Sequence, residues 1–410
     1  MKTVFFTVSL ILVLIGCSTQ KSVQKMENSQ DFYQYISQDS LISNILNQKE
    51  KYKAQIIYTQ INRDENNKPT FKNFELNADE NAYFYPASTV KFPLTILALQ
   101  RLNELKIDKK TTINFGAAFS GQTEATSEKN AENGLPTIQN YIKQILLVSD
   151  NASYNQLYEF LGQEYINEEL RKKGYEKTQI RHRLEIFLTP EENAATNPIS
   201  FLDNSGKIIY SEPLKVSKFQ FEKRNDFIGK AYYKGENLIN EPMDFSLKNR
   251  LPLNDLHSIL QNLIFPSEKS FHISNEDRLL LLKSMSMFPQ ESKFPAYSEN
   301  EYDAVCKFLL YGSGKGDRPK NIRIFNKVGD AYGQLTDAAY IVDFEKNIEF
   351  MLSATIYCNE DETLNDDKYD YETIGFPFMK KLGEMVYNFE TSRKRKNSPD
   401  LSEFQFDYSE

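Results

Sequence analysis

The sequence predicts a mixed fold of the α/β (α+β) kind, in which strands from both ends of the chain form one sheet beside a long helical middle. Two strand-like segments lie early in the chain, at residues 53–61 and 70–76. Three more lie near the end, at residues 322–329, 334–344 and 348–358. Because a two-stranded hairpin is not stable alone, we expect the two groups to pair with each other.

The first seventeen residues have the pattern of an export signal. Lys2 precedes a short apolar run from Val4 to Ile15, and the run ends at Gly16-Cys17. It is too short to span a bilayer, and a basic start with a small residue at its end is typical of a secretory signal. The pattern looks like a bacterial lipoprotein signal over residues 1–17, with Cys17 as the lipidated first residue of the mature chain. An ordinary signal peptide is the alternative.

The segment from residue 18 to residue 30 is polar and is expected to be a tether. We assign residues 31–390 to one folded domain, within which residues 193–246 alternate short strand-like pieces with turns. The charged residues 391–410 are expected to form a flexible tail. Helical spacing of apolar residues marks the segments 31–46, 92–99, 138–147, 154–161, 253–263, 275–287, 303–311 and 374–389.

Composition excludes several classes of function. The net charge of -8, with both signs interspersed, argues against nucleic acid as the main partner. Cys306 and Cys358 are isolated in apolar contexts, so we expect them to be buried. The three histidines are scattered and suggest no Ser-His-Asp triad. No cluster has metal-ligand spacing, so no metal and no cofactor is expected.

Ser88-Thr89-Val90-Lys91 is the central motif of the chain. No charged residue lies between Lys91 and Arg101, and a helix that is apolar all round is buried. Ser88 lies three residues before Lys91, so the two side chains share one face. Burial disfavours a charged amine, and a neutral Lys91 could accept the proton of a nucleophilic Ser88. Alternatively, Ser88 is a helix cap, and Pro93 could kink the helix or shift its start.

Two later motifs carry groups that could complete such a site. Ser149 follows one expected helix and precedes another, where a hydroxyl could relay a proton to a leaving group. Asn151 can offer a donor and an acceptor to an amide, although Ser149-Asp150-Asn151 could also be a helix cap. Lys327 could bind a substrate carboxylate beside Gly329, which lets substrate approach the strand. A solvated strand end is the alternative.

These three motifs carry a resemblance to a known family. Ser88-Thr89-Val90-Lys91, Ser149-Asp150-Asn151 and Lys327-Val328-Gly329 occur in the order of the three motifs of the penicillin-recognising serine enzymes. Over residues 51–389 the sequence resembles a class A serine β-lactamase or a close relative without lactamase activity. The resemblance implies an antiparallel five-stranded sheet flanked by helices, an all-helical lobe, and an oxyanion hole made by the backbone N–H groups of Ser88 and Asp330.

The departures from the family pattern concern the substrate and the second half of the reaction. Val328 stands where the family has a hydroxyl residue, and residues 193–246 exceed the family length. Arg183-Leu184-Glu185-Ile186-Phe187-Leu188-Thr189 matches the family's Arg-x-Glu-x-x-Leu-Asn except for the last residue. By resemblance Glu185 would activate the deacylating water. A surface salt-bridge residue is the equally weighted alternative.

Three functions follow from these observations. The first is an envelope serine hydrolase that cleaves β-lactam amides through an acyl-Ser88 intermediate. The second is a cell-wall peptidase or esterase with the same machinery and little lactamase activity. The third is a catalytically silent binding lipoprotein of the same fold. We expect a monomer, anchored to the membrane through its N-terminal lipid in the bacterial envelope.

Overall fold

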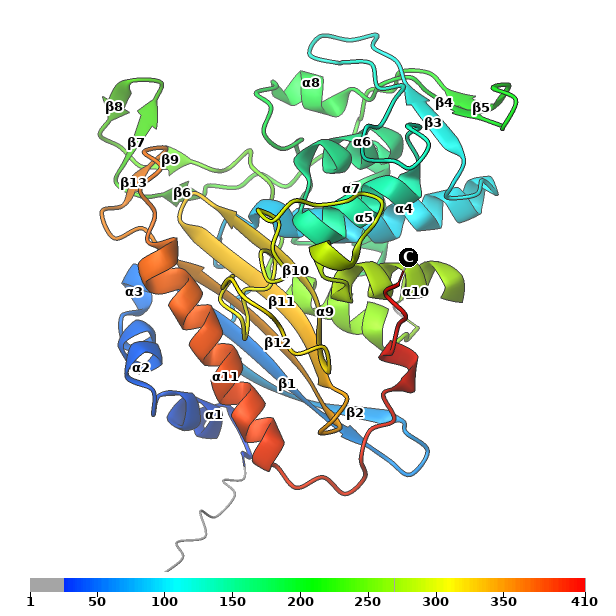
Figure 1. The fold of residues 1–410 in the computed structure, drawn as a ribbon. Helices are drawn as coiled ribbons and strands as arrows, with labels where there is room; N and C mark the ends of the chain where they lie inside the picture. The colour runs from blue at the N-terminus through cyan, green and yellow to red at the C-terminus, as the bar shows by residue number, and fades with distance from the viewer. Residues whose placement is uncertain (1–25, 269, 410) are drawn as a thin grey trace, which may run out of the picture.

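The computed structural model describes residues 26–268 and 270–409, and its centre is one antiparallel sheet of five strands. The strand order is β10-β11-β12-β1-β2 (Figure 1). Tyr58 of β1 lies opposite Leu352 of β12, so the two ends of the chain meet as predicted. The strands are β1 (Gln55–Arg63), β2 (Pro69–Leu76), β10 (Ile322–Ala331), β11 (Gln334–Asp343) and β12 (Ile348–Tyr357).

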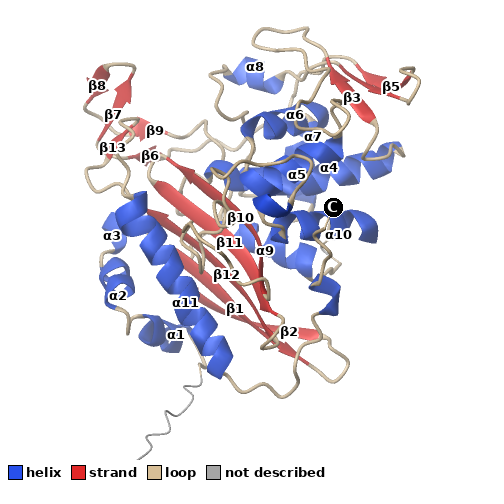
Figure 2. Cartoon of the chain, in the orientation of Figure 1, coloured by secondary structure: helices blue, strands red, loops and turns tan. Residues whose placement is uncertain are grey.

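One face of the sheet is covered by helices from both ends of the chain (Figure 2). The expected helical segment 31–46 is divided in two, because the Asp39 carboxylate accepts hydrogen bonds from the N–H groups of Leu41 and Ile42 at 3.0 and 3.2 Å and so starts a second helix. The helices on this face are α1 (Ser29–Ile36), α2 (Ser40–Asn47), α3 (Lys49–Tyr52) and α11 (Phe376–Ser392).

The opposite face carries α9 and, beyond it, the helical lobe. His257 of α9 lies between Thr59 and Ser353 of the sheet, and each ring nitrogen is 2.8 Å from a hydroxyl. Burial lowers the pKa of His257 to about 4, so the ring is neutral and serves packing. The helices on this side are α4 (Lys91–Leu105), α5 (Ile138–Val148), α6 (Asn151–Leu161), α7 (Gln163–Lys172), α9 (Leu253–Ile264) and α10 (Asn275–Ser286).

The segment 193–246 is rich in short strands, and they belong to two separate regions (Figure 1). The first half pairs with β3 at the outer side of the helical lobe, and the second half lies near the ends of β10 and β11. A short helix, α8 (Pro190–Ala194), precedes them. The strands are β3 (Thr112–Phe115), β4 (Ile199–Leu202), β5 (Ile208–Glu212), β6 (Phe227–Ile228), β7 (Ala231–Lys234), β8 (Asn237–Ile239), β9 (Met243–Asp244) and β13 (Thr363–Leu364).

Two expectations about irregular segments are wrong. Residues 303–311 form turns rather than a helix, because the N–H groups of Phe308 and Leu309 donate to the Asp337 carboxylate at 3.1 and 2.9 Å. The residues after 391 do not form a free tail. Phe404 is 1% exposed and its ring lies 4.9 Å from that of Tyr340, so the tail closes the core beside β10 and β11.

The N-terminal expectations fall largely outside the described residues. The signal segment 1–17, with Cys17, and residues 18–25 of the tether are not described. The rest of the expected tether is ordered: Met26 is 4% exposed, and α1 begins at Ser29 after a capping box at Asn28. Cys306 and Cys358 are unpaired, and Cys358 is buried. Within the described residues, no helix has the length and apolar character needed to cross a membrane.

Candidate active site

Ser88 lies in a short 3-10 turn, Ala87–Val90, that leads directly into α4. No side chain caps either the turn or α4, so the cap interpretation of Ser88 is wrong. Pro93 is the third residue of α4, where the backbone N–H would have no helical partner, so the helix begins at Lys91 without interruption. Ala87 has φ 46°, an uncommon left-handed conformation that turns the chain just before Ser88.

The Lys91 side chain is fully buried and reaches the loop between α5 and α6. Its ammonium nitrogen donates to the backbone carbonyl of Ser149 and lies 3.2 Å from Ser149 Oγ. Burial first, and the nearby Lys327 second, hold the pKa of Lys91 well below its usual range. An amine in this setting can exist in the neutral form that accepts a proton.

Ser149 Oγ receives a second lysine from the sheet. Lys327 of β10 donates from Nζ to Ser149 Oγ at 2.7 Å and to the carbonyl of Val328 at 2.8 Å. Lys327 is 3% exposed, and burial lowers its pKa to about 8. The chain therefore brings Lys91, Ser149 and Lys327 together at one hydroxyl, and the interpretation of Lys327 as a solvated strand end is wrong.

The cap interpretation of the second motif holds for one residue only. The Asp150 carboxylate accepts the N–H of Ser153 at 2.6 Å and caps α6. Ser149 precedes this cap in a left-handed conformation with φ 62°, which leaves its hydroxyl for the two lysines. Asn151 is the first residue of α6 and is partly exposed.

Gly329 brings β10 against the turn that carries Ser88. A Cβ at this position would lie 2.7 Å from the carbonyl oxygen of Pro86 and 2.9 Å from the backbone nitrogen of Ser88. Only a residue without a side chain permits this approach. Asp330 follows at the exposed end of β10, so the backbone of residues 329–330 lies beside that of Ser88.

Val328 points the other way. Its side chain is 2% exposed and packs in the cluster under α11. The position that has a hydroxyl in the resembled family therefore carries a buried apolar side chain, and β10 offers no hydroxyl to a substrate there.

Glu185 lies at the exposed tip of the loop that follows α7 and has φ 59°. Within the described chain its carboxylate has no ion pair and no hydrogen bond, so the salt-bridge alternative is not supported. Its negative charge nevertheless acts on Lys91 and raises the pKa of that lysine against the effect of burial. Glu185 is therefore electrostatically coupled to the lysine site.

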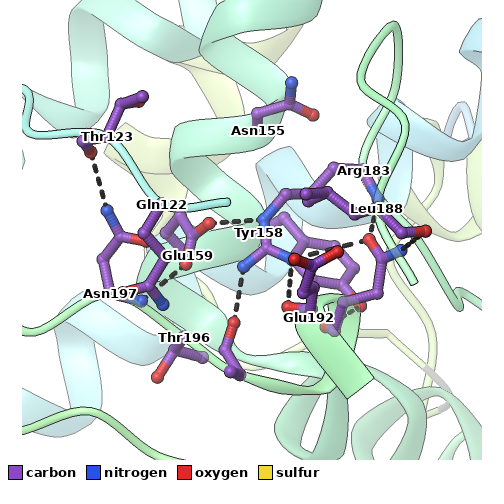
Figure 3. Close-up of polar contacts among 12 residues, drawn as sticks. Gln122, Thr123, Asn155, Tyr158, Glu159, Arg183, Leu188, Glu192, Thr196 and Asn197 are labelled. Carbon is purple, nitrogen blue, oxygen red and sulfur yellow. Dashed lines mark hydrogen bonds and ion pairs between the residues drawn. The ribbon is translucent and has the colours of Figure 1, made fainter. Parts of the chain in front are cut away.

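The loop that bears Glu185 is held from beneath by a buried charge pair (Figure 3). Arg183, 3% exposed, donates from Nε to the Glu159 carboxylate of α6, and from Nη2 to the carbonyl of Ala195 at 2.6 Å. The other Glu159 oxygen accepts the N–H of Asn197 at 2.7 Å. These contacts tie both ends of the loop to one helix.

Asn155 and Thr189 fix the loop further. The Asn155 side chain, one turn along α6, exchanges two hydrogen bonds of 2.9 Å with the backbone of Leu184 (Figure 3). Thr189 forms a capping box with Glu192 at the start of α8, with bonds of 3.2 and 2.8 Å. Threonine replaces the family's asparagine at a position that here starts a helix.

Sequence reasoning missed Glu159, Asn155 and Asn249. Asn249 is fully buried, and its side-chain oxygen accepts the N–H groups of Arg181 and His182 at 2.7 and 3.1 Å. Its carbonyl accepts the Tyr83 hydroxyl at 3.0 Å. These partners are separated along the chain and include backbone groups, so no local pattern marks them. In the sequence, only the matched Arg-x-Glu pattern pointed to this loop.

Comparison with known proteins agrees with this architecture. The fold is β-lactamase/transpeptidase-like. The sequence profile of Beta-lactamase2, the Beta-lactamase enzyme family, matches residues 38–388, and the chain belongs to this family. No curated protein sequence gives a significant match.

Several solved structures are similar in outline, at low identity. PBP-A shares 15% identity, covering 90% of this chain and 98% of that chain, with a TM-score of 0.49. A β-lactamase from Xanthomonas campestris pv. campestris shares 14%, covering 88% and 98%, with a TM-score of 0.48. A class A β-lactamase from Clostridium kluyveri shares 14%, covering 84% and 98%, with a TM-score of 0.47. The family membership rests on the profile match.

Proposed function

We propose that this protein is a serine hydrolase that cleaves β-lactam amides through an acyl-Ser88 intermediate. The observation that carries the proposal is the meeting of Lys91 and Lys327 at Ser149 Oγ, with β10 packed against the Ser88 turn at Gly329. Membership of the Beta-lactamase enzyme family supports the choice of reaction. PBP-A, one of the structures similar in outline, is known as an acyl-enzyme complex with penicillin G.

In the acylation step, Ser88 Oγ attacks the amide carbonyl carbon while its proton passes to the neutral amine of Lys91. The developing oxyanion accepts hydrogen bonds from the backbone N–H groups of Ser88 and Asp330. The C–N bond then breaks, and the nitrogen takes a proton relayed through Ser149 Oγ. Lys327 and Asn151 hold the substrate's carboxylate and amide groups.

In the deacylation step, Glu185 accepts a proton from a water molecule that attacks the ester carbonyl. The ester C–O bond breaks, a carboxylic acid leaves and the Ser88 hydroxyl is restored. The exposed carboxylate of Glu185 without a competing ion pair supports this role.

The test is labelling of the purified protein with a fluorescent penicillin. We expect covalent label on Ser88, none on Ser88→Ala, and normal labelling of the control Ser120→Ala, which changes an exposed loop serine. Glu185→Gln is expected to be labelled at the wild-type rate and to release the label at least about 10²-fold more slowly. Its control is Glu191→Gln, in the same loop region. An intact wild-type protein that takes no label would contradict the hydrolase and favour a binding role.

A cell-wall peptidase or esterase is the second candidate, and Val328 favours it. A buried valine cannot donate to a substrate carboxylate, and so weakens recognition of a β-lactam acid group. Stable labelling of the wild-type protein, without release over hours, would support this candidate. Fast release would support a lactamase.

We also propose that the chain is anchored to the bacterial envelope by a lipid on Cys17. Metabolic labelling with a fatty acid is expected to mark the wild-type protein and not Cys17→Ala, with Cys306→Ala as the matched control. A wild-type protein without label, or cleaved at another residue, would contradict the anchor.

A further inference from the structure

Three aromatic rings meet where the inserted segment touches the catalytic half of the molecule. Tyr85, Phe245 and Tyr332 lie with ring centroids 5.1 to 5.7 Å apart, each pair edge to face. Phe245 is fully buried and Tyr85 is 5% exposed. Edge-to-face pairs at such distances are favourable beyond the area they bury. We call these three residues the aromatic seat.

The seat joins the two backbone segments that supply the proposed oxyanion hole. Tyr85 lies three residues before Ser88, and Tyr332 lies two residues after Asp330. These segments belong to different elements, the 3-10 turn before α4 and the end of β10. On the site side they touch at Gly329. On the seat side, Phe245 contacts both tyrosine rings.

Phe245 is itself held firmly within the insertion. The Arg224 guanidinium donates from Nη2 to the carbonyls of Phe245 and Ser246 at 3.2 and 3.0 Å, and also to that of Lys248. Nη1 lies 3.1 Å from the Asp226 carboxylate, whose backbone carbonyl accepts the N–H of Phe245 at 2.8 Å. The segment 224–248 therefore presents the Phe245 ring in one fixed place.

We propose that Phe245 is a positioning residue for the oxyanion hole, so that the insertion is a working part of the site. It acts by fixing the Ser88 and Asp330 N–H groups relative to each other through Tyr85 and Tyr332. Oxyanion donors act only within a narrow range of distances from the developing charge, and a misplacement of about 1 Å can cost about 10²-fold in rate. This proposal rests on the acyl-Ser88 reaction proposed above.

The test compares Phe245→Ala with Phe219→Ala in the full chain. Phe219 belongs to the same insertion, but its ring packs on Phe221 at 4.9 Å and under Arg171 of α7, away from the seat. Two readouts are needed: the second-order rate of acylation by a fluorescent penicillin, and backbone amide hydrogen exchange.

We expect Phe245→Ala to lower the acylation rate at least about 10-fold and to weaken binding of a boronic acid, which mimics the tetrahedral intermediate, in parallel. The pH at half-maximal acylation should not change, because Lys91 is untouched. Amide exchange should rise in residues 85–90 and 329–333 and stay constant in β12. Phe219→Ala should leave all four quantities within about twofold.

Acylation within twofold of wild type, or exchange that rises across β12 as well, would overturn the proposal, since the first removes the effect and the second makes it global loosening. A wild-type protein that is never acylated would refute the proposed function instead. In that case the exchange data still decide whether Phe245 couples the two segments.

Discussion

The two sides of Ser88 are built in different ways. On one side, Lys91, Ser149 and Lys327 bond directly to one another through buried side chains. On the other side, Glu185 is exposed, and only its loop is anchored, through Arg183 and Asn155. The acylating side is thus preorganised by side-chain contacts, whereas the deacylating side is positioned through the main chain. Changes on the first side should affect rate, and changes on the second should affect loop stability and release.

The largest expected effect comes from Lys91→Ala. Acylation should fall about 10³-fold, as for the loss of a general base, while the melting temperature should not fall, because a buried cation is costly. Wild-type acylation should also decrease as pH is lowered through the depressed pKa of Lys91, since the protonated amine cannot accept a proton. Stopped-flow labelling measures both. Lys110→Ala, an exposed lysine, is the control, and labelling of Lys91→Ala at the wild-type rate would break the comparison.

Arg183→Leu should act mainly on stability and release. It leaves the Glu159 carboxylate buried without its partner, which costs about 3–5 kcal/mol of unfolding free energy. Urea unfolding measures this loss. Removing both charges in Arg183→Leu with Glu159→Leu should recover part of the loss. Acylation should stay within about threefold of wild type, and a drop in acylation equal to the drop in release would show that the two sides are not separate.

Thr189→Ala should have a smaller effect on the same loop. It removes the capping box of α8 and should cost about 1 kcal/mol. Thr189→Asn, which keeps a capping side chain and supplies the family residue, should retain most of the stability. Thermal unfolding of the three proteins under one set of conditions gives the ranking, and equal loss in both variants would show that the cap is not what matters.

The smallest effect is a pH dependence on the Glu185 side. Burial lowers the pKa of His182 to about 4, against 6.5 in an unfolded chain. Between these values the unfolded chain binds a proton that the folded chain does not, so stability should fall as pH drops from about 6.5 to about 4, and His182 should add no further loss below that. His182→Asn should make the fall in melting temperature shallower, although His257 contributes in the same direction. His272→Asn, an exposed histidine, should not change it.

The sequence was sufficient where local pattern and burial agree. The five strands and the motif residues of the lysine side were predictable, because period-two patterns and short motifs leave a mark in neighbouring residues. The clamp around Arg183 was not, because Glu159 and Asn197 reach it from other elements and backbone carbonyls complete it. The C-terminal tail was misjudged because Leu401 and Phe404 stand among charged residues that conceal their place in the core.

The pairing of β1 with β12 sets an order of events during synthesis of the chain. Residues 55–60 must wait for residues 350–355 before the middle of the sheet can close. Lys327 reaches Ser149 only when β10 is seated on β11, late in translation. A chain cut short by stalling or clipped before residue 357 would retain Ser88 and Lys91 yet lack the sheet that brings the second lysine to them. Such fragments would be inert towards substrate, so reactivity is confined to finished molecules.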